Sequence, residues 1–225
     1  MGLVHSSPRT VTDGLVLALD AGNTKSYPGS GTTWTDTVGG NNGTLTNGPT
    51  HSSNSGGYFE FPNSNSYIQL SSPVLTTPTS LSVEVWVKVT DTSASYSRFL
   101  SNRDAHTDGF EAGFESTNKW YLQINGAVSN ISSATVNQDQ WYHVVWNYDG
   151  SLGKIFADGV QIQTVGFGSQ TINTTTAAAI GAVSHQLSTV QNKFEIGELR
   201  VYNNKALTAA EVLQNYNAHK TRYGH

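Results

Sequence analysis

The segment QWYHVVWNYDGSLGKIFADGVQIQTVGF, residues 140–167, carries the clearest structural signal in the sequence. Its first residues alternate between two sets of side chains with a period of two, which predicts a strand with both faces occupied. Asp149-Gly150 ends this run, and Asp158-Gly159 between the next two runs is typical of a type I′ hairpin turn. The segment therefore predicts a meander of three antiparallel strands at the centre of an all-β domain.

The segment LSVEVWVKV, residues 81–89, has the most regular alternation in the chain. Its odd-numbered residues are Leu or Val, and this aliphatic face is expected to pack against a second sheet. Glu84 and Trp86 then share the face that points away from the core between the sheets. On that face they either line a ligand groove or, as we favour, lie beneath a covering layer.

The composition of the 225-residue chain limits the classes of function. Charged residues make up 12% of the chain, against about 25% in an average protein, and Ser, Thr, Asn and Gly fill the deficit. The net charge is −4 and Lys and Arg do not cluster, which argues against nucleic acid as a partner. The absence of cysteine excludes disulfides and thiolate metal sites.

The ends of the chain predict three parts. Residues 1–13 form a polar N-terminal arm, either a flexible tail or an arm docked on a neighbouring subunit. Residues 14–206 form the main domain. Thr208 and Glu211 fit a helix capping box, so residues 207–225 are expected to contain a short helix. We interpret this helical segment as a clasp packed on the sandwich edge. No signal-peptide pattern and no apolar run of about 20 residues is present, so we expect no membrane insertion.

Two finer predictions concern strand pairing and strand faces. The motifs YFEF and YIQL, within residues 57–70, are expected to pair as a hairpin. In the final strand, residues 194–202, strict alternation places Phe194 and Glu198 on one face and Glu195 on the other.

Three motifs in this order, LSVEVWVKV, WYHVVWNYDGSLGKIFADG and FEIGELRVYNNKALTAAEVLQNY, resemble the laminin-G-like, concanavalin A-like jelly-roll domains. The opening residues 13–50 resemble a bacteriophage subgroup of these domains, found in marine phage structural proteins. The resemblance covers residues 13–223. It implies an all-β, two-sheet antiparallel jelly-roll sandwich with one short C-terminal helix, and a packing role for Trp141 and His143.

The sequence does not predict an enzyme. Related glucanases carry an E-x-D-x-x-E motif on one strand, and this motif is absent. Glu111 and Glu115 share a strand face by parity, but four residues of strand separate them by about 13 Å. Retaining hydrolysis needs carboxyl groups about 5 Å apart.

Some members of the resembled family hold Ca²⁺ with oxygen ligands from loops at the rim. The local candidates here are Asp104 and Asp108 in NRDAHTDGF, although calcium prefers six to eight oxygen ligands and a run of this kind also suits a solvated loop. The chain is therefore expected to need no cofactor and to be compatible with bound Ca²⁺.

Carbohydrate binding is the commonest task of the resembled family, and a sugar needs an aromatic platform beside polar groups. Trp120 and Tyr121 are the first candidates, and because alternate strand residues face opposite ways only one of them can face a ligand. Trp86 and Glu84 are the second pair of candidates.

Our leading hypothesis from these observations is a non-enzymatic bacteriophage virion structural protein, serving as a capsid decoration or a tail-associated adhesion module. It would be made in the host cytoplasm, located in the virion, and partnered by other virion proteins and host-surface glycans. A homo-oligomer is compatible with this role. The alternative is an extracellular bacterial lectin or carbohydrate-binding module, and a glycoside hydrolase is the third hypothesis.

Overall fold

The computed structural model describes residues 8–93, 96–115, 117–187 and 193–225. One set of strands comprises β1 (Leu15–Asp20), β4 (Thr50–Ser52), β5 (Tyr58–Glu60), β7 (Leu81–Val89), β12 (Trp141–Tyr148), β13 (Leu152–Ala157), β14 (Val160–Gly166) and β16 (Phe194–Asn203). The other comprises β2 (Thr33–Trp34), β3 (Gly43–Thr46), β6 (Tyr67–Leu70), β8 (Tyr96–Asn102), β9 (Phe110–Glu115), β10 (Lys119–Ile124), β11 (Ala127–Ile131) and β15 (Ala179–Ile180). The helical segments are η1 (Asn54–Gly56), α1 (Ala209–His219) and η2 (Lys220–Tyr223).

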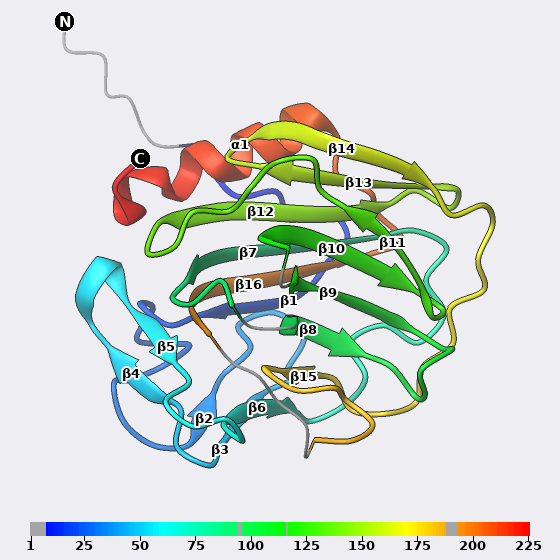
Figure 1. Cartoon of the computed structure of the whole chain (residues 1–225). Helices are drawn as coiled ribbons and strands as arrows, with labels where there is room; N and C mark the ends of the chain where they lie inside the picture. Colours follow the sequence, from blue (N-terminus) through cyan, green and yellow to red (C-terminus); the bar gives the residue numbers. More distant parts are fainter. Residues whose placement is uncertain (1–7, 94–95, 116, 188–192) are drawn as a thin grey trace, which may run out of the picture.

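Within the described residues these strands form two eight-stranded antiparallel sheets stacked face to face (Figure 1). Sheet A has the order β14-β13-β12-β7-β16-β5-β4, with β1 also paired to β16, and sheet B has the order β11-β10-β9-β8-β15-β6-β3-β2. The predicted all-β jelly-roll sandwich with one short C-terminal helix is therefore confirmed.

Strand β7 lies in the middle of sheet A and is buried on both faces. Its aliphatic residues, from Leu81 to Val89 at alternate positions, join the core between the two sheets as predicted. The predicted meander is also present, since β12, β13 and β14 pair in sequence. Asp158 and Gly159 have φ angles of 51° and 82°, which suit the type I′ turn between β13 and β14.

Helix α1 begins with the predicted capping box, in which the Thr208 hydroxyl accepts from the Glu211 N–H and the Glu211 carboxylate accepts from the Thr208 N–H. The helix and η2 pack on the outer face of sheet A, where Trp86 and Tyr223 stack with ring centroids 4.3 Å apart. Helix α1 also contacts β14, the edge strand of this sheet. The interpretation of Trp86 as a covered residue is thereby confirmed. No helix in the described part of the chain has the length and apolar character needed to cross a membrane.

A buried network of charges joins sheet A to this C-terminal cover. Glu84 accepts hydrogen bonds from Arg200 Nη1 at 3.0 Å and from Asn215 Nδ2 of α1 at 2.7 Å. Arg200 also bonds Glu198, which accepts from Arg222 Nη1 of η2 at 2.7 Å. Glu84 and Glu198 are both fully buried. Removing one member of such a network leaves its partner as an uncompensated buried charge, which is strongly destabilising.

Part of the predicted N-terminal arm packs on the chain's own helix. The Val11 N–H donates to Asn215 Oδ1 at 2.8 Å, and Thr10 Oγ1 lies 3.0 Å from His219 Nε2. Residues 1–7 lie outside the described residues, so docking on a neighbouring subunit stays a prediction.

The predicted hairpin within residues 57–70 is wrong. Strand β5 pairs with β4 and β16 in sheet A, whereas β6 pairs with β3 and β15 in sheet B. Phe59 and Ile68 enter the same core from opposite sheets. Two short apolar strands close in sequence can therefore face each other across the core instead of pairing side by side.

The predicted faces of the last strand are also wrong after Ile196. Ile196 lies opposite Val87, but Glu198 lies opposite Trp86, so Gly197 is an extra residue in β16. This bulge reverses the alternation and puts Glu198 on the outer face together with Glu195, not opposite it. A Cβ at position 197 would lie 2.3 Å from Tyr223 Oη, so glycine also lets η2 approach the sheet.

The network predicts how stability depends on pH. Burial by itself would raise the pKa of Glu84, but Arg200, His143 and Asn215 outweigh burial and lower this pKa from 4.5 to about 2. Because the folded-state pKa is depressed, the stability from this carboxylate is complete above pH 4.5 and is lost as the pH falls towards about 2. Urea denaturation over this range should show the decline.

Glu84→Gln should be less stable at neutral pH and should lose less further stability on acidification. The control Asp13→Asn removes a carboxylate that is 79% exposed, and its pH profile should match that of the unaltered chain. Parallel profiles for Glu84→Gln and the unaltered chain would contradict the assignment of this acid sensitivity to Glu84.

Candidate functional site

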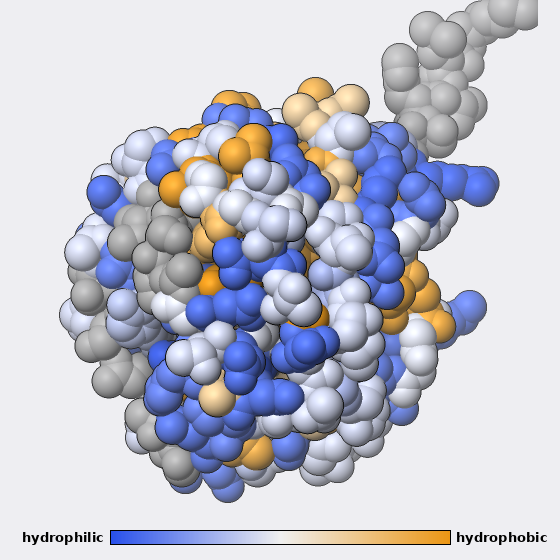
Figure 2. Space-filling view, turned by 90° about the vertical axis from the view of Figure 1, so that its right-hand side faces the viewer, coloured by the Kyte–Doolittle hydropathy of each residue, from blue (hydrophilic) through white to orange (hydrophobic). Residues whose placement is uncertain are grey.

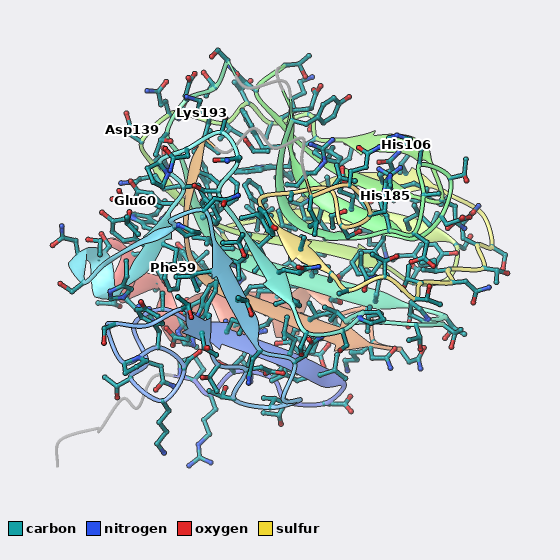
Figure 3. The ribbon with its side chains drawn as sticks, turned by 90° about the horizontal axis from the view of Figure 1, so that it is seen from below. Phe59, Glu60, His106, Asp139, His185 and Lys193 are labelled. Carbon is teal, nitrogen blue, oxygen red and sulfur yellow. The ribbon has the colours of Figure 1, made fainter. Side chains whose placement is uncertain are left out.

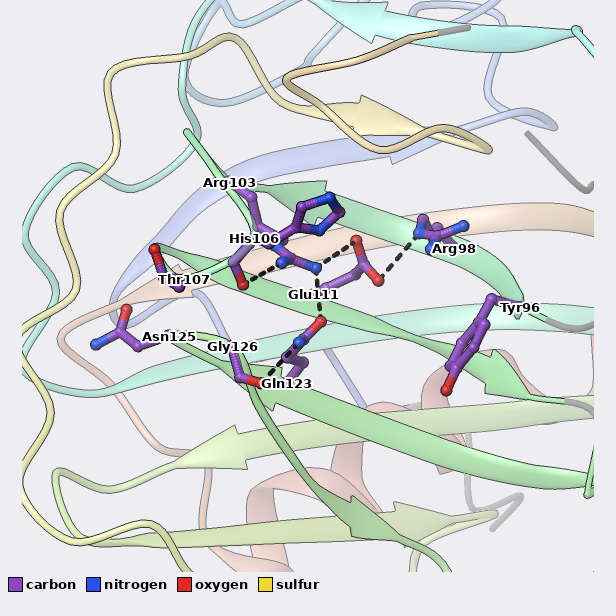
Figure 4. Close-up of a pocket in the computed structure, with 9 residues that line it drawn as sticks. All are labelled: Tyr96, Arg98, Arg103, His106, Thr107, Glu111, Gln123, Asn125 and Gly126. Carbon is purple, nitrogen blue, oxygen red and sulfur yellow. Dashed lines mark hydrogen bonds and ion pairs between the residues drawn. The ribbon is translucent and has the colours of Figure 1, made fainter. Parts of the chain in front are cut away.

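A pocket of about 570 Å³ opens on the outer face of sheet B (Figure 4). Its described lining residues come from three neighbouring strands and the loops that follow them: Tyr96, Arg98, Arg103, His106, Thr107, Glu111, Gln123, Asn125 and Gly126.

Strand register explains why polar side chains meet here. Arg98 of β8 lies opposite Gly113 of β9, which lies opposite Tyr121 of β10. Gln123 lies opposite Glu111 in the same way. Side chains alternate between faces along a strand, so these residues share the outer face while their neighbours enter the core.

Glu111 is the centre of a buried polar network on the pocket floor (Figure 4). Its Oε1 lies 3.0 Å from Arg98 Nε and accepts from the Tyr121 hydroxyl at 2.7 Å. Its Oε2 lies 3.5 Å from Arg103 Nη1, which also donates to Gln123 Oε1 at 2.6 Å. The negative charge of Glu111 is thereby shared between two guanidinium groups.

Arg103 is fixed by its own loop. Its Nε donates to the Ala105 carbonyl at 3.2 Å, and its Nη2 donates to the His106 carbonyl. The hydroxyl of Ser184 binds the backbone N–H and carbonyl of Arg103, both at 2.7 Å. A side chain held this firmly can orient Glu111 and Gln123 before any ligand arrives.

Tyr96 presents a partly exposed phenol ring to the pocket. It is 37% exposed, and its ring meets the Tyr121 ring edge to face with centroids 5.3 Å apart. The guanidinium carbon of Arg98 lies 5.5 Å from the centre of the Tyr96 ring. The pocket therefore combines an aromatic face with polar groups in fixed positions.

Tyr121 supports this arrangement from beneath. A Cβ at position 113 would lie 2.7 Å from Tyr121 Cε1, so Gly113 leaves the space that the ring occupies. Burial and the neighbouring Glu111 carboxylate raise the pKa of Tyr121 well above its ordinary value. The phenol stays protonated at neutral pH and can act as the hydrogen-bond donor to Glu111.

Two histidines, His106 and His185, lie close together (Figure 3), and His106 lines the pocket. The ring centroids of His106 and His185 are 5.1 Å apart, and the rings are nearly perpendicular. Burial, Arg103 and His106 lower the pKa of His185. This imidazole is therefore neutral at neutral pH.

The structure separates the four residues that the sequence suggested for carbohydrate binding. Trp120 is 1% exposed and packs in the core between the sheets. Tyr121 is fully buried beneath the pocket, and Glu84 and Trp86 are fully buried beneath α1 and η2. The expectation that these side chains offer a surface to a sugar is therefore wrong, because none has an exposed face.

The two acidic residues suggested for calcium do not form a metal-binding group. The Asp104 carboxylate accepts from the backbone N–H groups of Thr175 and Thr176, at 2.9 and 2.7 Å, and ties two loops together. Asp108 is exposed. In residues 8–93, 96–115, 117–187 and 193–225, no three His, Cys, Asp or Glu side chains gather in a metal-binding arrangement. Calcium binding stays a prediction.

Sequence reasoning missed Tyr96, Arg98, Arg103 and Gln123. The available signal was the shared parity of the outer-face residues in three successive strands, once those strands are placed side by side. Arg103 carries no such signal, because it lies in the loop after β8.

Residues 62–213, more than half of the chain, match the model of the concanavalin A-like lectin/glucanases superfamily. The chain therefore belongs to this superfamily. No curated protein matches the sequence.

Several solved structures share the fold at low sequence identity. The Trypanosoma rangeli sialidase superposes with a TM-score of 0.70 and 15% identity, over 96% of this chain and 34% of the sialidase. Domain 4 of AbnA, an extracellular arabinanase of Geobacillus stearothermophilus, was solved in complex with arabinotriose. It superposes with a TM-score of 0.68 and 18% identity, over 90% of this chain and 98% of that domain. The binding domain of Paraclostridial Mosquitocidal Protein 1 superposes with a TM-score of 0.70 and 14% identity, over 91% of this chain and 52% of the mosquitocidal chain. The chain spans about a third of the sialidase.

Substitutions should distinguish the core tryptophan from the pocket tyrosine. Trp120→Ala should lower the free energy of unfolding by about 3–5 kcal/mol, because it empties a large volume in the core. Tyr96→Ala should change it by less than about 1 kcal/mol, because this ring is partly exposed. Urea denaturation measures both. A stable Trp120→Ala variant would contradict the core assignment.

Proposed function

We propose that the chain is a carbohydrate-binding domain that holds a sugar in the sheet B pocket. The observation that carries this proposal is Tyr96, a partly exposed ring beside the fixed polar groups of Arg98, Gln123 and Glu111. Sugar rings pack their C–H faces on aromatic side chains, while their hydroxyls bind planar amide, guanidinium and carboxylate groups.

The relatives support a binding role. Domain 4 of AbnA was solved in complex with arabinotriose, and the mosquitocidal relative is a binding domain. Their identity to this chain is low, so they support the use of the fold for binding and do not indicate which sugar is bound.

We further propose that binding occurs without cleavage. Among the described residues of the pocket, Glu111 supplies the one carboxylate. Two arginines and Tyr121 already bind it. Glycoside hydrolysis normally needs a pair of carboxyl groups flanking the scissile bond, one of them free to give up a proton.

The virion setting is a narrower proposal about where the domain works. It is supported by the resemblance of residues 13–50 to phage structural proteins and by the small share of charged residues, 12%. In this setting the pocket would face host-surface glycans from a capsid or a tail. Mass spectrometry of purified virions from the phage that encodes the chain should detect it, and virions without it would overturn this setting but not sugar binding.

A glycan array followed by calorimetry tests the binding proposal. Tyr96→Ala should weaken the affinity for the best array ligand at least about tenfold. Tyr96→Phe should retain binding, because the aromatic face supplies the contact. Leu152→Ala is the matched control, since Leu152 is 38% exposed and Tyr96 is 37% exposed, and Leu152 lies on sheet A.

Two outcomes would contradict these proposals. A protein that binds no glycan, or one whose binding survives Tyr96→Ala but not Leu152→Ala, would contradict a sugar site in the pocket. Release of reducing sugar from the bound glycan would contradict binding without cleavage.

A further inference from the structure

We propose that the pocket selects sugars that carry a carboxylate, and that Arg98 is the specificity-determining residue. This inference rests on the proposed function, because it names the class of ligand for the same pocket.

The charges that line the pocket favour an anion. Arg98 and Arg103 contribute two positive charges and Glu111 contributes one negative charge, so these three lining residues sum to +1. The whole chain has a net charge of −4. The pocket is thus a local positive region on an acidic protein, which attracts an anionic ligand and disfavours a cationic one.

Glu111 does not cancel this preference. Its side chain is 2% exposed, and both of its oxygens contact guanidinium or phenol donors. A ligand therefore does not meet a free carboxylate at the pocket floor. Burial and the Arg103 guanidinium lower the pKa of the nearby His185 imidazole, which is consistent with a positive charge in this region of the pocket.

The two arginines have different tasks. Arg103 is 4% exposed, and its Nε, Nη1 and Nη2 all donate to oxygens of the protein, so it positions Glu111 and Gln123. Arg98 is 18% exposed and binds Glu111 through Nε. Arg98 is therefore the guanidinium that is more accessible to a ligand.

The position of Arg98 beside Tyr96 restricts the kind of anion. The Arg98 guanidinium lies over the Tyr96 ring, with its carbon 5.5 Å from the ring centre, so the two side chains are direct neighbours. A carboxylate bound to Arg98 would bring the sugar that carries it next to Tyr96. Guanidinium groups match planar carboxylates well, so a carboxylate-bearing sugar can use both side chains at once.

Calorimetry on the full chain tests this with pairs of ligands in which one member carries a carboxylate and the other does not. Oligogalacturonate should bind at least about tenfold more tightly than the same oligomer after methyl esterification, which keeps the sugar backbone and removes the charge. Sialyllactose against lactose is a second pair, and it separates uronic acids from nonulosonic acids as the source of the carboxylate. Added salt should weaken the binding of the acidic ligands and leave the binding of the neutral ligands almost unchanged.

Variants assign the effect to Arg98. Arg98→Gln should weaken the affinity for the acidic ligand about tenfold and change the affinity for the neutral ligand less than about twofold. Arg98→Lys should recover part of the lost affinity, because it restores the charge. Lys154→Gln is the control, since it removes one positive charge from β13 of sheet A. Thermal melting of each variant monitors folding.

The results separate the two proposals. Equal affinity for the acid and its ester would overturn the selection of carboxylates and leave sugar binding intact. No binding of any glycan would overturn both. If Arg98→Gln does not fold, the acid–ester ratio and the salt dependence of the unaltered chain decide the question.

Discussion

The burial of β7 on both faces is the constraint on which the rest of the structure depends. Its aliphatic face requires a second sheet, and its other face carries Glu84 and Trp86, which are fully buried and need a cover with matching charge and shape. Sheet B supplies the first layer, and α1 with η2 supplies the second (Figure 1). Because the outer face of sheet A is occupied in this way around β7, the pocket on the outer face of sheet B is the better candidate for a ligand site.

The two outer faces carry similar chemistry with different consequences. On sheet A, Arg200 lies between Glu84 and Glu198 beneath the C-terminal cover, and the network holds the chain together. On sheet B, Glu111 lies between Arg98 and Arg103 beneath an open pocket. Within sheet A, two carboxylates share the single guanidinium of Arg200, and η2 supplies a second guanidinium, that of Arg222. Within the sheet B network, two guanidinium groups share the single carboxylate of Glu111. In the surface view of Figure 2, hydrophilic and near-neutral residues make up most of the coloured surface and hydrophobic ones form small separate patches, so the described residues of that face form no broad apolar surface.

Local features of this fold could be predicted from sequence, and long-range features could not. The meander, its Asp-Gly turn and the capping box at Thr208 depend on neighbouring residues, and all are present. Strands β5 and β6 join different sheets because of partners that are distant in sequence. The bulge at Gly197 is linked to η2, because Tyr223 of η2 occupies the space that a side chain at position 197 would need. The pocket needs three strands in register and a loop arginine. From the sequence, Glu111 is considered only as one of a catalytic pair, and Tyr121 only as one of two aromatic candidates for sugar binding.

Mapping a bound sugar by NMR tests the central claim most directly, because it reports on both outer faces at once. During titration with the best glycan, we expect the largest amide shifts around Tyr96, Arg98, Glu111 and Gln123, with little change in α1. Saturable shifts concentrated in α1 and η2, or around the hollow lined by Tyr27 and His51, would contradict the assignment of the ligand site to sheet B.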